Sequence, residues 1–488
     1  MRVVFIASEC VPFSKTGGLA DVAGALPQAL SALGHAVDVF IPRYRMTKPG
    51  RPIPEASSVT IPIGPKFRFA SVQDGGKARG VSYYLIEMPE YFDRNGLYQT
   101  KDGKDYPDNP ERFSAFCLAT LEFLKRSPTA ADILHCHDWQ TSLAPVYLRT
   151  YYQDDPCLKN ACVVLTIHNL GYQGLFPADV LSGIGIPQSL FNVDMLEFFG
   201  KVNLLKGGIV FADFITTVSR RYAEEIKTKE FGFGLEGVLQ KRSSRLQGIL
   251  NGVDYDAWDP ATDKLIAKTY SPADLSGKGV CKKALLEKMG AKAPRLERPV
   301  IGIVSRFAAQ KGFDLIAGIA EQLMAMDLYI VALGTGEPKY EALFRSLAER
   351  FPDRFLVKVA YDNELAHQIE AGADIFLMPS RYEPAGLNQI YSLKYGTVPI
   401  VRATGGLDET IQNFDGVSGT GFKFSDYSAV ELLATVQRAL QAYHQRDVWG
   451  RLMLEGMSKD YSWGNSAAEY VKIYQRLRQE RDRTLAAS

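Results

Sequence analysis

Short runs of β-branched and apolar residues alternate along the chain with longer stretches in which apolar residues recur every three or four positions. The short runs predict buried strands and the longer stretches predict amphipathic helices, an alternation typical of parallel sheets covered by helices. The strands expected in the first half are Val3–Ala7, Ala36–Ile41, Ile133–His137, Cys162–Ile167 and Phe214–Val218. Those expected in the second half are Val300–Val304, Leu328–Leu333, Phe355–Ala360, Ile375–Pro379 and Val398–Val401. The pattern therefore predicts an α/β protein with two sheets.

Length and turn signals divide the chain into parts. At 488 residues it is too long for one ordinary hydrophobic core, so two domains are expected. The Asn-Gly turn signal within Gln247–Val253 predicts the crossing between them. We therefore predict a first domain over 1–247, a second over 248–462 and a terminal helix over 463–488.

Composition argues against several classes of function. The 56 basic and 55 acidic side chains give a formal charge of +1, so no global field favours nucleic acid or an anionic membrane. The six cysteines include no Cys-x-x-Cys pair and are expected to be free thiols. Glu9 interrupts the first apolar run, which argues against a signal peptide, and no stretch approaches the ~18 apolar residues of a membrane span. We expect a cytoplasmic protein.

Two similar glycine turns follow apolar strands, one in each half of the chain. Lys15-Thr16-Gly17-Gly18 precedes a helical stretch that carries Leu26, Leu30 and Leu33, and Thr404-Gly405-Gly406 precedes another helix. Glycines let a phosphate approach the amides, and the N–H groups and dipole of a helix N-terminus favour negative charge. The turns predict anion sites in two similar lobes, with Lys15 adding a point charge. Ordinary strand-to-helix turns are the alternative.

Charged side chains gather where strands of the second half end. Arg306 follows the strand Val300–Val304, Lys311 lies in the next turn, and Glu383 follows Ile375–Pro379. Fixed cations in a water-poor site stabilise the charge of a departing diphosphate, and a carboxylate suits sugar hydroxyls. The cations could instead be surface charges, and Glu383 could cap a helix. The strand-end positions favour a functional site.

Three other motifs lack the context that their chemistry needs. Gly232-Phe233-Gly234-Leu235-Glu236-Gly237 fits a dinucleotide pattern but follows a charged helical stretch instead of a strand. Asp254-Tyr255-Asp256 lies beside a turn signal, where aspartates cap turns. His135-Cys136-His137-Asp138 has no further histidine cluster to complete a zinc site, so we interpret it as a strand end that delivers polar side chains. We expect no metal.

The order of these blocks resembles the bacterial and plastid glycogen (starch) synthases, glucosyltransferases that use ADP-glucose. The resemblance covers nearly the whole chain. It rests on Lys15 to Leu19, His137-Asp138-Trp139, Thr166 to Asn169, Asn251 to Asp254, Ser305-Arg306-Phe307 and Glu383 to Leu387. It implies the GT-B fold, with two facing Rossmann-like domains, a deep cleft between them and a C-terminal helix that crosses back to the first domain.

The resemblance also assigns roles to residues. The catalytic residues that it implies are Glu383, His168, Asp138, Arg306 and Lys311, and the substrate-binding residues are Lys15, Glu9, Gly18, Asn169, Asn251, Tyr361, Gly386, Leu387, Thr404, Gly405 and Gly406. Among them, Glu383 contacts glucose and Tyr361 stacks on adenine. This chain departs from the family at Ala385, where a cysteine is common, so a role for that thiol cannot apply here.

The implied reaction moves glucose from ADP-glucose to the non-reducing end of an α-1,4-glucan with retention of the α configuration. The departing phosphate helps to deprotonate the acceptor hydroxyl, and no cofactor is expected. The expected partners are ADP-glucose or ADP and glycogen, in a monomer or small homo-oligomer. The residues themselves do not decide between ADP and UDP. Three alternatives are a glucan phosphorylase, which would need pyridoxal phosphate, a nucleotide-sugar epimerase and a catalytically silent glucan-binding protein.

Overall fold

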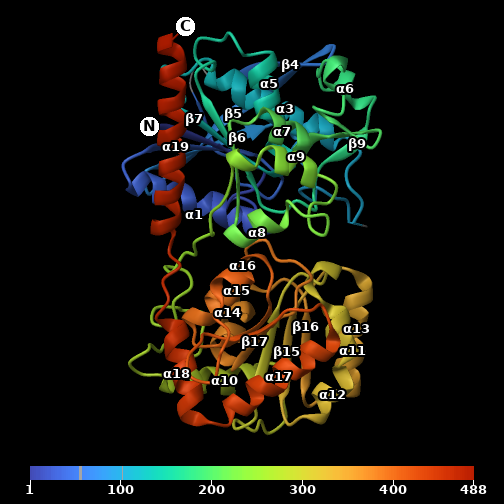
Figure 1. Ribbon diagram of the computed structural model, residues 1–488, viewed down its shortest axis with the longest axis vertical. Coiled ribbons are helices and arrows are strands. Elements are labelled where there is room, and N and C mark those ends of the chain that lie inside the picture. The colour runs from blue at the N-terminus through green and yellow to red at the C-terminus, as the bar shows by residue number, and fades with distance from the viewer. Residues whose placement is uncertain (54–57, 102, 488) are drawn as a thin grey trace. The chain divides into compact units, whose positions relative to one another are not determined.

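The computed structural model describes residues 1–53, 58–101 and 103–487 (Figure 1). The chain divides into two compact units. Unit 1 comprises Met1–Gly252 with Trp463–Ser488, and unit 2 comprises Val253–Ser462. The chain changes unit after Gly252, inside the segment in which the sequence predicts a crossing. Among the described residues, none of the helices combines the length and the apolar composition needed to cross a bilayer.

Unit 1 is built on a ten-stranded sheet. Its parallel part has the order β13-β12-β8-β7-β1-β2-β6, and β5, β3 and β4 extend it with antiparallel pairs. The strands are β1 (Arg2–Ile6), β2 (Ala36–Pro42), β3 (Arg51–Pro52), β4 (Ser58–Ile63), β5 (Lys66–Ala78), β6 (Val81–Glu87), β7 (Ile133–His137), β8 (Cys162–Ile167), β12 (Phe214–Thr217) and β13 (Leu246–Gly248). A separate small sheet holds β9 (Leu175–Pro177), β10 (Glu197–Phe198) and β11 (Lys201–Asn203).

The antiparallel extension corrects the expectation of purely parallel sheets. Residues alternate strictly between exposed and buried along β4, and few side chains of β5 are buried. One-sided alternation is typical of antiparallel strands that face water on one side. A search for continuous apolar runs therefore finds the central strands of unit 1 and misses this edge.

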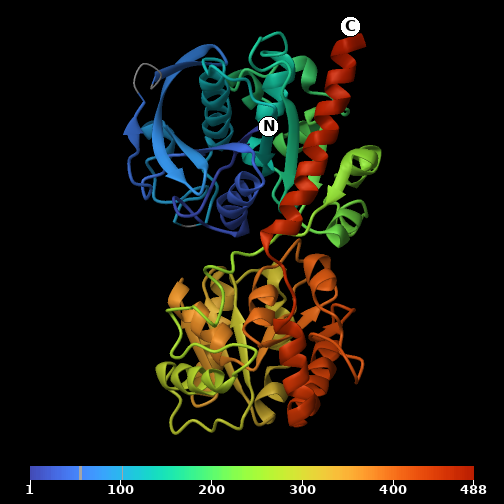
Figure 2. The same cartoon turned by 90° about the vertical axis from the view of Figure 1, so that its left-hand side faces the viewer.

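Helices cover the sheet of unit 1. They are α1 (Gly18–Ala32), α2 (Pro89–Phe92), α3 (Asn109–Leu124), α4 (Asp138–Thr141), α5 (Leu143–Thr150), α6 (Val180–Gly183), α7 (Leu204–Phe211), α8 (Arg220–Glu225), α9 (Glu236–Lys241) and α19 (Trp463–Ala487). Leu26 and Leu30 of α1 are buried as predicted, but Leu33 is 49% exposed because the helix ends at Ala32. The long α19, red in Figure 2, packs beside α1. Its Tyr470 and Tyr474 belong to the same apolar cluster as Val3 and Phe5 of β1.

Unit 2 contains a six-stranded parallel sheet with the order β16-β15-β14-β17-β18-β19. The strands are β14 (Val300–Val304), β15 (Tyr329–Gly334), β16 (Phe355–Val359), β17 (Ile375–Met378), β18 (Val398–Arg402) and β19 (Phe422–Phe424). Numbered along the unit this order is 3-2-1-4-5-6, that of a Rossmann fold. All five strands predicted for this half are confirmed.

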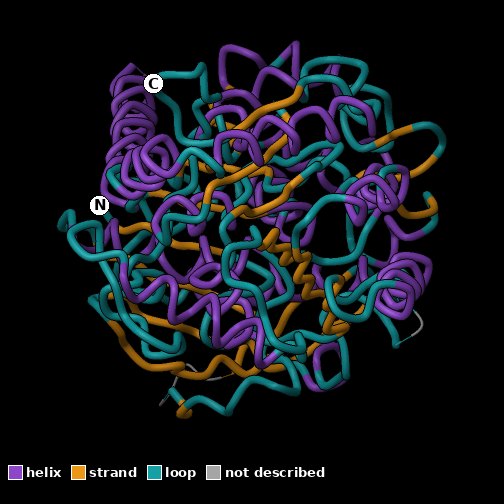
Figure 3. Tube along the Cα trace, turned by 90° about the horizontal axis from the view of Figure 1, so that it is seen from below, coloured by secondary structure: helices purple, strands orange, loops and turns teal. Residues whose placement is uncertain are grey.

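Alternating residues of β14 place apolar side chains on both faces of this sheet. Ile301 and Ile303 join a cluster with α11, α12, α13, α17 and α18, whereas Val300 joins a cluster with α10 and α14. The helices are α10 (Ser276–Lys288), α11 (Phe313–Gly318), α12 (Ala320–Ala325), α13 (Pro338–Arg350), α14 (Asn363–Gly372), α15 (Asn388–Lys394), α16 (Gly405–Thr410), α17 (Ala429–Tyr443) and α18 (Arg446–Met457). Figure 3 distinguishes strands from helices by colour. Sheet residues therefore contact helices on both sides, as a doubly wound unit requires.

Candidate functional site

The strand order of unit 2 reverses between β14 and β17, which is where open α/β sheets bind ligands. Lys311 ends the short 3₁₀ turn Ala309–Lys311 after β14, and Glu383 lies in the loop after β17. The Lys311 Nζ lies 2.6 Å from Glu383 Oε2. Glu383 is only 6% exposed, so this ion pair is largely shielded from water. The structure thus brings Lys311 and Glu383 into contact, whereas the sequence had assigned each of them to the site separately.

Hydrogen bonds fix the two loops that carry this pair. The Ser380 hydroxyl donates to Glu383 Oε2 at 2.9 Å. The Arg381 amide donates to the Gln310 carbonyl at 2.8 Å, and Gln310 Nε2 donates to the Tyr382 carbonyl at 3.1 Å. Because both loops are held through backbone groups, the positions of Lys311 and Glu383 are set before any ligand binds. Ser380 and Gln310 were not predicted from the sequence.

The Thr404-Gly405-Gly406 turn packs directly against the segment that carries Glu383. The Gly406 amide donates to the Glu383 carbonyl at 3.1 Å. A Cβ added at Gly405 would lie 1.9 Å from the Glu383 carbonyl oxygen, and one at Gly406 would lie 1.9 Å from the Ala385 oxygen. Only glycine permits this approach, so the turn supports the loop that carries Glu383.

The remaining predicted residues of unit 2 differ in exposure. Arg306 is exposed, and Tyr361 is 76% exposed at the end of β16, which argues against plain packing of its ring. Gly386 has a φ of 66° and begins the turn into α15. Leu387 packs against the apolar cluster that contains Val253, Ile390 and Tyr391, so its side chain contributes to the core.

The sequence did not predict the contribution of the turn after β15 to this site. Glu337 follows the Gly334-Thr335-Gly336 turn at the end of β15, and its Oε1 accepts a hydrogen bond from the Ala309 amide at 2.9 Å. That bond lowers the pKa of Glu337, with a smaller contribution from the positive charge of Arg306. The turn therefore braces the loop of Lys311. The sequence feature that could have indicated this turn is its Gly-x-Gly pattern directly after an apolar strand.

Unit 1 has its own reversal of strand order, between β1 and β7. Asp138, with a φ of 57°, follows β7, and its Oδ1 accepts a hydrogen bond from the His168 amide at 2.7 Å. The structure therefore brings together Asp138 and His168, as the strand ends predicted. The pKa of Asp138 is raised to about 7, mainly by burial and in smaller part by the charge of Glu9, although the amides of His168 and Asn169 oppose this increase.

The glycine turn of unit 1 already holds a carboxylate. Glu9 is 4% exposed and accepts hydrogen bonds from the Thr16 hydroxyl at 2.9 Å, from the Gly17 amide at 3.3 Å and from the Thr16 amide. Tyr98 also donates to it at 3.1 Å. The sequence predicted this turn as a phosphate site, but in the structure the anion at Thr16 and Gly17 is Glu9.

The cation of this turn is also engaged. Lys15 Nζ lies 2.7 Å from Asp21 Oδ1, and the Lys15 side chain is 38% exposed. Gly18 is the first residue of α1. Exposed ion pairs contribute little to stability, so Lys15 can leave Asp21 for a ligand at small cost.

Three imidazoles form a continuous array behind Asp138. The rings of His135 and His137 stack with centroids 4.3 Å apart, and His137 Nδ1 lies 3.0 Å from His168 Nε2. Tyr474 of α19 contacts His135 Nδ1 at 2.8 Å. Burial lowers the pKa of His135 and of His168 to about 3, and it lowers that of His137 as well. All three rings are therefore neutral near pH 7.

Neutrality restricts how His137 and His168 share a proton. One of the two facing nitrogens must carry hydrogen and the other must accept it. His137 Nε2 is buried and has no hydrogen-bond partner among the described residues. Because a buried N–H without an acceptor is the less favourable state, we assign the proton of His137 to Nδ1. His168 then accepts at Nε2 and carries its own proton on Nδ1.

The other predicted residues of unit 1 lie near loop turns. Asn169 Oδ1 accepts a hydrogen bond from the Gly171 amide at 3.0 Å. Asn251 is 5% exposed at the end of the first segment of unit 1, and its Oδ1 has no partner among the described residues. Asn169 therefore shapes the loop after His168.

The motifs set aside earlier have structural roles. The segment before Gly232 consists of α8 and turns, without a strand. Asp254 Oδ1 accepts from the Asp256 amide at 2.9 Å, as in a capped turn. His135 uses both ring nitrogens, on Tyr474 and on Thr166. Across residues 1–53, 58–101 and 103–487, no group of three or more His, Cys, Asp or Glu side chains is arranged to hold a metal ion.

Known families match both units. The starch synthase catalytic domain family matches residues 2–241, and the group 1 glycosyl transferases match residues 287–451. A glycogen synthase from Koribacter versatilis is 55% identical over 483 residues, which cover 99% of each chain. This chain belongs to the glycogen and starch synthase family. It is therefore a glucosyltransferase, as its motifs implied.

Solved structures support the same family. The catalytic domain of starch synthase IV from Arabidopsis thaliana, bound to ADP and acarbose, matches with a TM-score of 0.90 and 33% identity, over 98% of this chain and 99% of that one. Sucrose-phosphate synthase from Thermosynechococcus elongatus matches with a TM-score of 0.60 at 18% identity, which shows the fold alone. The expected GT-B fold class of two α/β domains is confirmed.

Proposed function

We propose that this protein is a glycogen synthase that transfers glucose from ADP-glucose to the non-reducing end of an α-1,4-glucan with retention of the α configuration. The observation that carries the proposal is the contact of Lys311 with Glu383 at 2.6 Å, at the reversal of strand order in unit 2. The name of the relative from Koribacter supports a glucan acceptor, and the ADP of the Arabidopsis structure supports an adenine nucleotide.

Unit 2 supplies the groups that we assign to the donor. As the bond to glucose breaks, negative charge develops on the departing ADP, and a cation held in place stabilises that charge more than it stabilises the bound substrate. Lys311 is this cation, and Arg306, between β14 and the turn of Lys311, is the second. Glu383 holds Lys311 and accepts hydrogen bonds from the sugar. The exposed ring of Tyr361 is available to stack on adenine.

Unit 1 supplies polar groups that we assign to the sugar and the acceptor. Asp138 accepts hydrogen bonds from sugar hydroxyls, and neutral His168 donates from Nδ1. Neither residue needs to act as a nucleophile, because the acceptor oxygen bonds to the anomeric carbon on the same face from which ADP departs. The departing phosphate takes the proton of the acceptor hydroxyl. The proposal includes no metal and no cofactor. A cytoplasmic location and a monomer or small homo-oligomer stay predictions.

The decisive experiment compares donors directly. The purified protein is incubated with glycogen and radiolabelled ADP-glucose or UDP-glucose, with EDTA present in a parallel series. We expect label in precipitated polymer with ADP-glucose, unchanged by EDTA, and release of that label by an enzyme specific for α-1,4 bonds. Absence of incorporation from both donors would refute the proposal, and incorporation from UDP-glucose alone would correct the donor.

A further inference from the structure

Two turns of unit 1 hold phenylalanine in the left-handed backbone region. Phe199 has a φ of 48° and precedes Gly200, and Phe233 has a φ of 49° and precedes Gly234. Glycine, asparagine and aspartate adopt this region readily, whereas a bulky side chain is strained in it. Phe199 is nevertheless 83% exposed and Phe233 is 41% exposed. Burial of the two rings therefore does little to offset the backbone strain.

The two turns meet through one ring. Phe198 of β10 packs edge-on against Phe199 with centroids 4.7 Å apart. A Cβ added at Gly234 would lie 2.8 Å from Phe198 Cζ, so the turn of Phe233 lies directly against the same ring. We call these three phenylalanines the aromatic turn surface. Strain kept at exposed residues, away from any core, is typical of a functional site.

This surface is tied to the loop that begins at His168. Gln173, in that loop, is 6% exposed and donates from Nε2 to the Phe233 carbonyl at 3.2 Å. Its Oε1 accepts from Asn203 Nδ2 at 2.7 Å, and Asn203 in turn caps α7. The aromatic turn surface is therefore held rigidly to the predicted acceptor side of the site.

Charged side chains of both signs lie near the turns. Glu197 Oε1 accepts from the Gly200 amide at 2.7 Å, and Lys241 lies 3.5 Å from Asp194. Such a surface favours an uncharged ligand over a nucleic acid or an acidic peptide. The apolar C–H faces of pyranose rings stack on aromatic rings, and a glucan is an uncharged polymer of them.

We propose that the aromatic turn surface binds the α-glucan chain beyond the sugar that accepts glucose. The proposal rests on the proposed function for the identity of the polymer. It assigns to Phe199 and Phe233 the affinity for long acceptors and gives them no part in donor binding.

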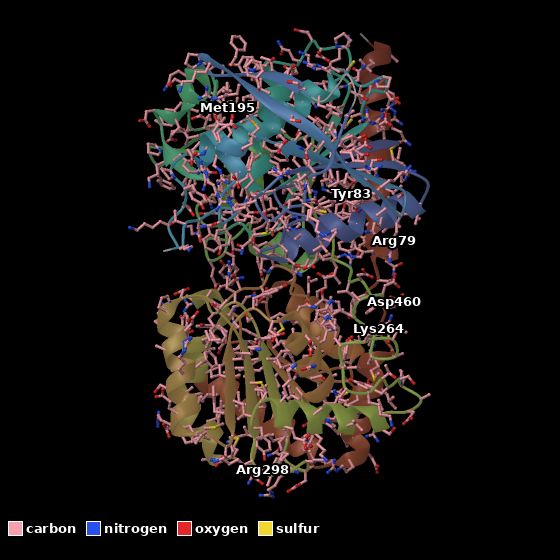
Figure 4. The ribbon with its side chains drawn as sticks, turned by 180° about the vertical axis from the view of Figure 1, so that it is seen from behind. Arg79, Tyr83, Met195, Lys264, Arg298 and Asp460 are labelled. Carbon is pink, nitrogen blue, oxygen red and sulfur yellow. The ribbon has the colours of Figure 1, made fainter. Side chains whose placement is uncertain are left out.

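Asparagine provides a sharp test because it tolerates positive φ. In Phe199→Asn, Phe233→Asn and the double variant, the turns keep their preferred conformation but lose the aromatic rings. Arg79→Asn is the matched control, since Arg79, with a φ of 47°, precedes Gly80 in the turn between β5 and β6. Figure 4 places Arg79 far across unit 1 from Met195, which lies just before β10.

The binding of maltoheptaose is measured by calorimetry without donor, and the KM values for glycogen and for ADP-glucose are measured by label incorporation. We expect the double variant to raise the maltoheptaose Kd and the glycogen KM about tenfold. The KM for ADP-glucose should equal that of Arg79→Asn, and the melting temperature should be no lower than that of Arg79→Asn. Arg79→Asn itself should match the wild type in both.

Unchanged glucan binding in the double variant would overturn the proposal, since an apolar partner protein or plain packing would then explain the rings. A melting temperature several degrees lower would likewise assign Phe199 and Phe233 to folding. If the wild type binds maltoheptaose through this surface but transfers no glucose, the proposed function fails and the surface stands.

Discussion

The two Thr-Gly-Gly-Leu turns have the same sequence and different uses. In unit 1, Thr16 and Gly17 bind the Glu9 carboxylate through hydrogen bonds. In unit 2, Gly405 and Gly406 lie against the carbonyls of Glu383 and Ala385. One turn therefore holds an internal anion, and the other supports the loop that carries Glu383. A glycine turn provides close approach, and its surroundings decide what approaches.

The largest difference between the turns should appear in their neighbouring lysines. Lys311 is an ordered and largely shielded cation, whereas Lys15 is more exposed and paired with Asp21. We expect Lys311→Ala to lower kcat about 10²–10³-fold. Lys15→Ala should cost about tenfold or less, because an exposed charge is screened by solvent. Steady-state kinetics with both substrates saturating measure the two effects.

Lys358→Ala is the control for charge removal, because Lys358 forms an exposed ion pair with Asp362, four residues along the chain. Circular dichroism should show intact folds in all three variants. Equal losses for Lys311→Ala and Lys15→Ala would remove the distinction between the turns.

Alanine substitutions test the glycines themselves. In Gly406→Ala the new Cβ would meet the Ala385 oxygen at 1.9 Å, so the loop of Glu383 must move. We expect a loss of about 1–3 kcal/mol in the free energy of unfolding, with a large fall in kcat. In Gly17→Ala nothing lies within 4 Å of the new Cβ, and the backbone is extended with a φ of −156°. Its unfolding free energy should change by less than about 0.5 kcal/mol.

Urea denaturation of both variants gives these values directly. A destabilised Gly17→Ala variant would show that the turn of unit 1 is packed as tightly as that of unit 2.

The carboxylate in the first turn should affect the pH dependence of activity. Asp138 has a pKa of about 7, and the negative charge of Glu9 contributes to that increase. Below this pH the carboxyl is protonated and cannot accept from two sugar hydroxyls, so kcat/KM should rise as the pH rises through about 7. Glu9→Gln removes the charge, so the rising limb should move to lower pH. If the rising limb of the kcat/KM profile stays at the same pH in Glu9→Gln, the charge of Glu9 does not affect the pKa of Asp138.

We expect the smallest effect on activity from changes to the neutral histidines. These buried groups of unit 1 contrast with the Lys311–Glu383 ion pair of unit 2. His137→Asn can still donate to His168 Nε2 with its side-chain amide, whereas His137→Phe cannot. We expect Asn to retain most of the activity and Phe to lower kcat about tenfold, because His168 loses its fixed tautomer. Nitrogen NMR of the His168 ring reads the tautomer. A proton on Nε2 of His168 in the wild type would contradict the assignment.

The sequence predicted the central strands well because their burial on both faces leaves continuous apolar runs. It missed β4 and β5, whose exposed faces interrupt such runs, and also β6, in which buried and half-buried residues alternate. Strand-end positions predicted Lys311, Glu383, Asp138 and His168. The contact between Lys311 and Glu383 could not be predicted, since these residues are 72 positions apart and meet only through the order of strands. Nothing in the sequence indicated that the Glu9 carboxylate would accept hydrogen bonds from Thr16 and Gly17.

The discontinuity of unit 1 has a consequence for biosynthesis. Unit 2 is one continuous segment, but Trp463, Tyr470 and Tyr474 of α19 fill the apolar cluster around β1. On the ribosome, unit 2 can therefore mature while the first-made portion still exposes the groove for a helix that has yet to emerge. Translation order and folding order are thus inverted, and the nascent N-terminal portion should be the species that chaperones protect.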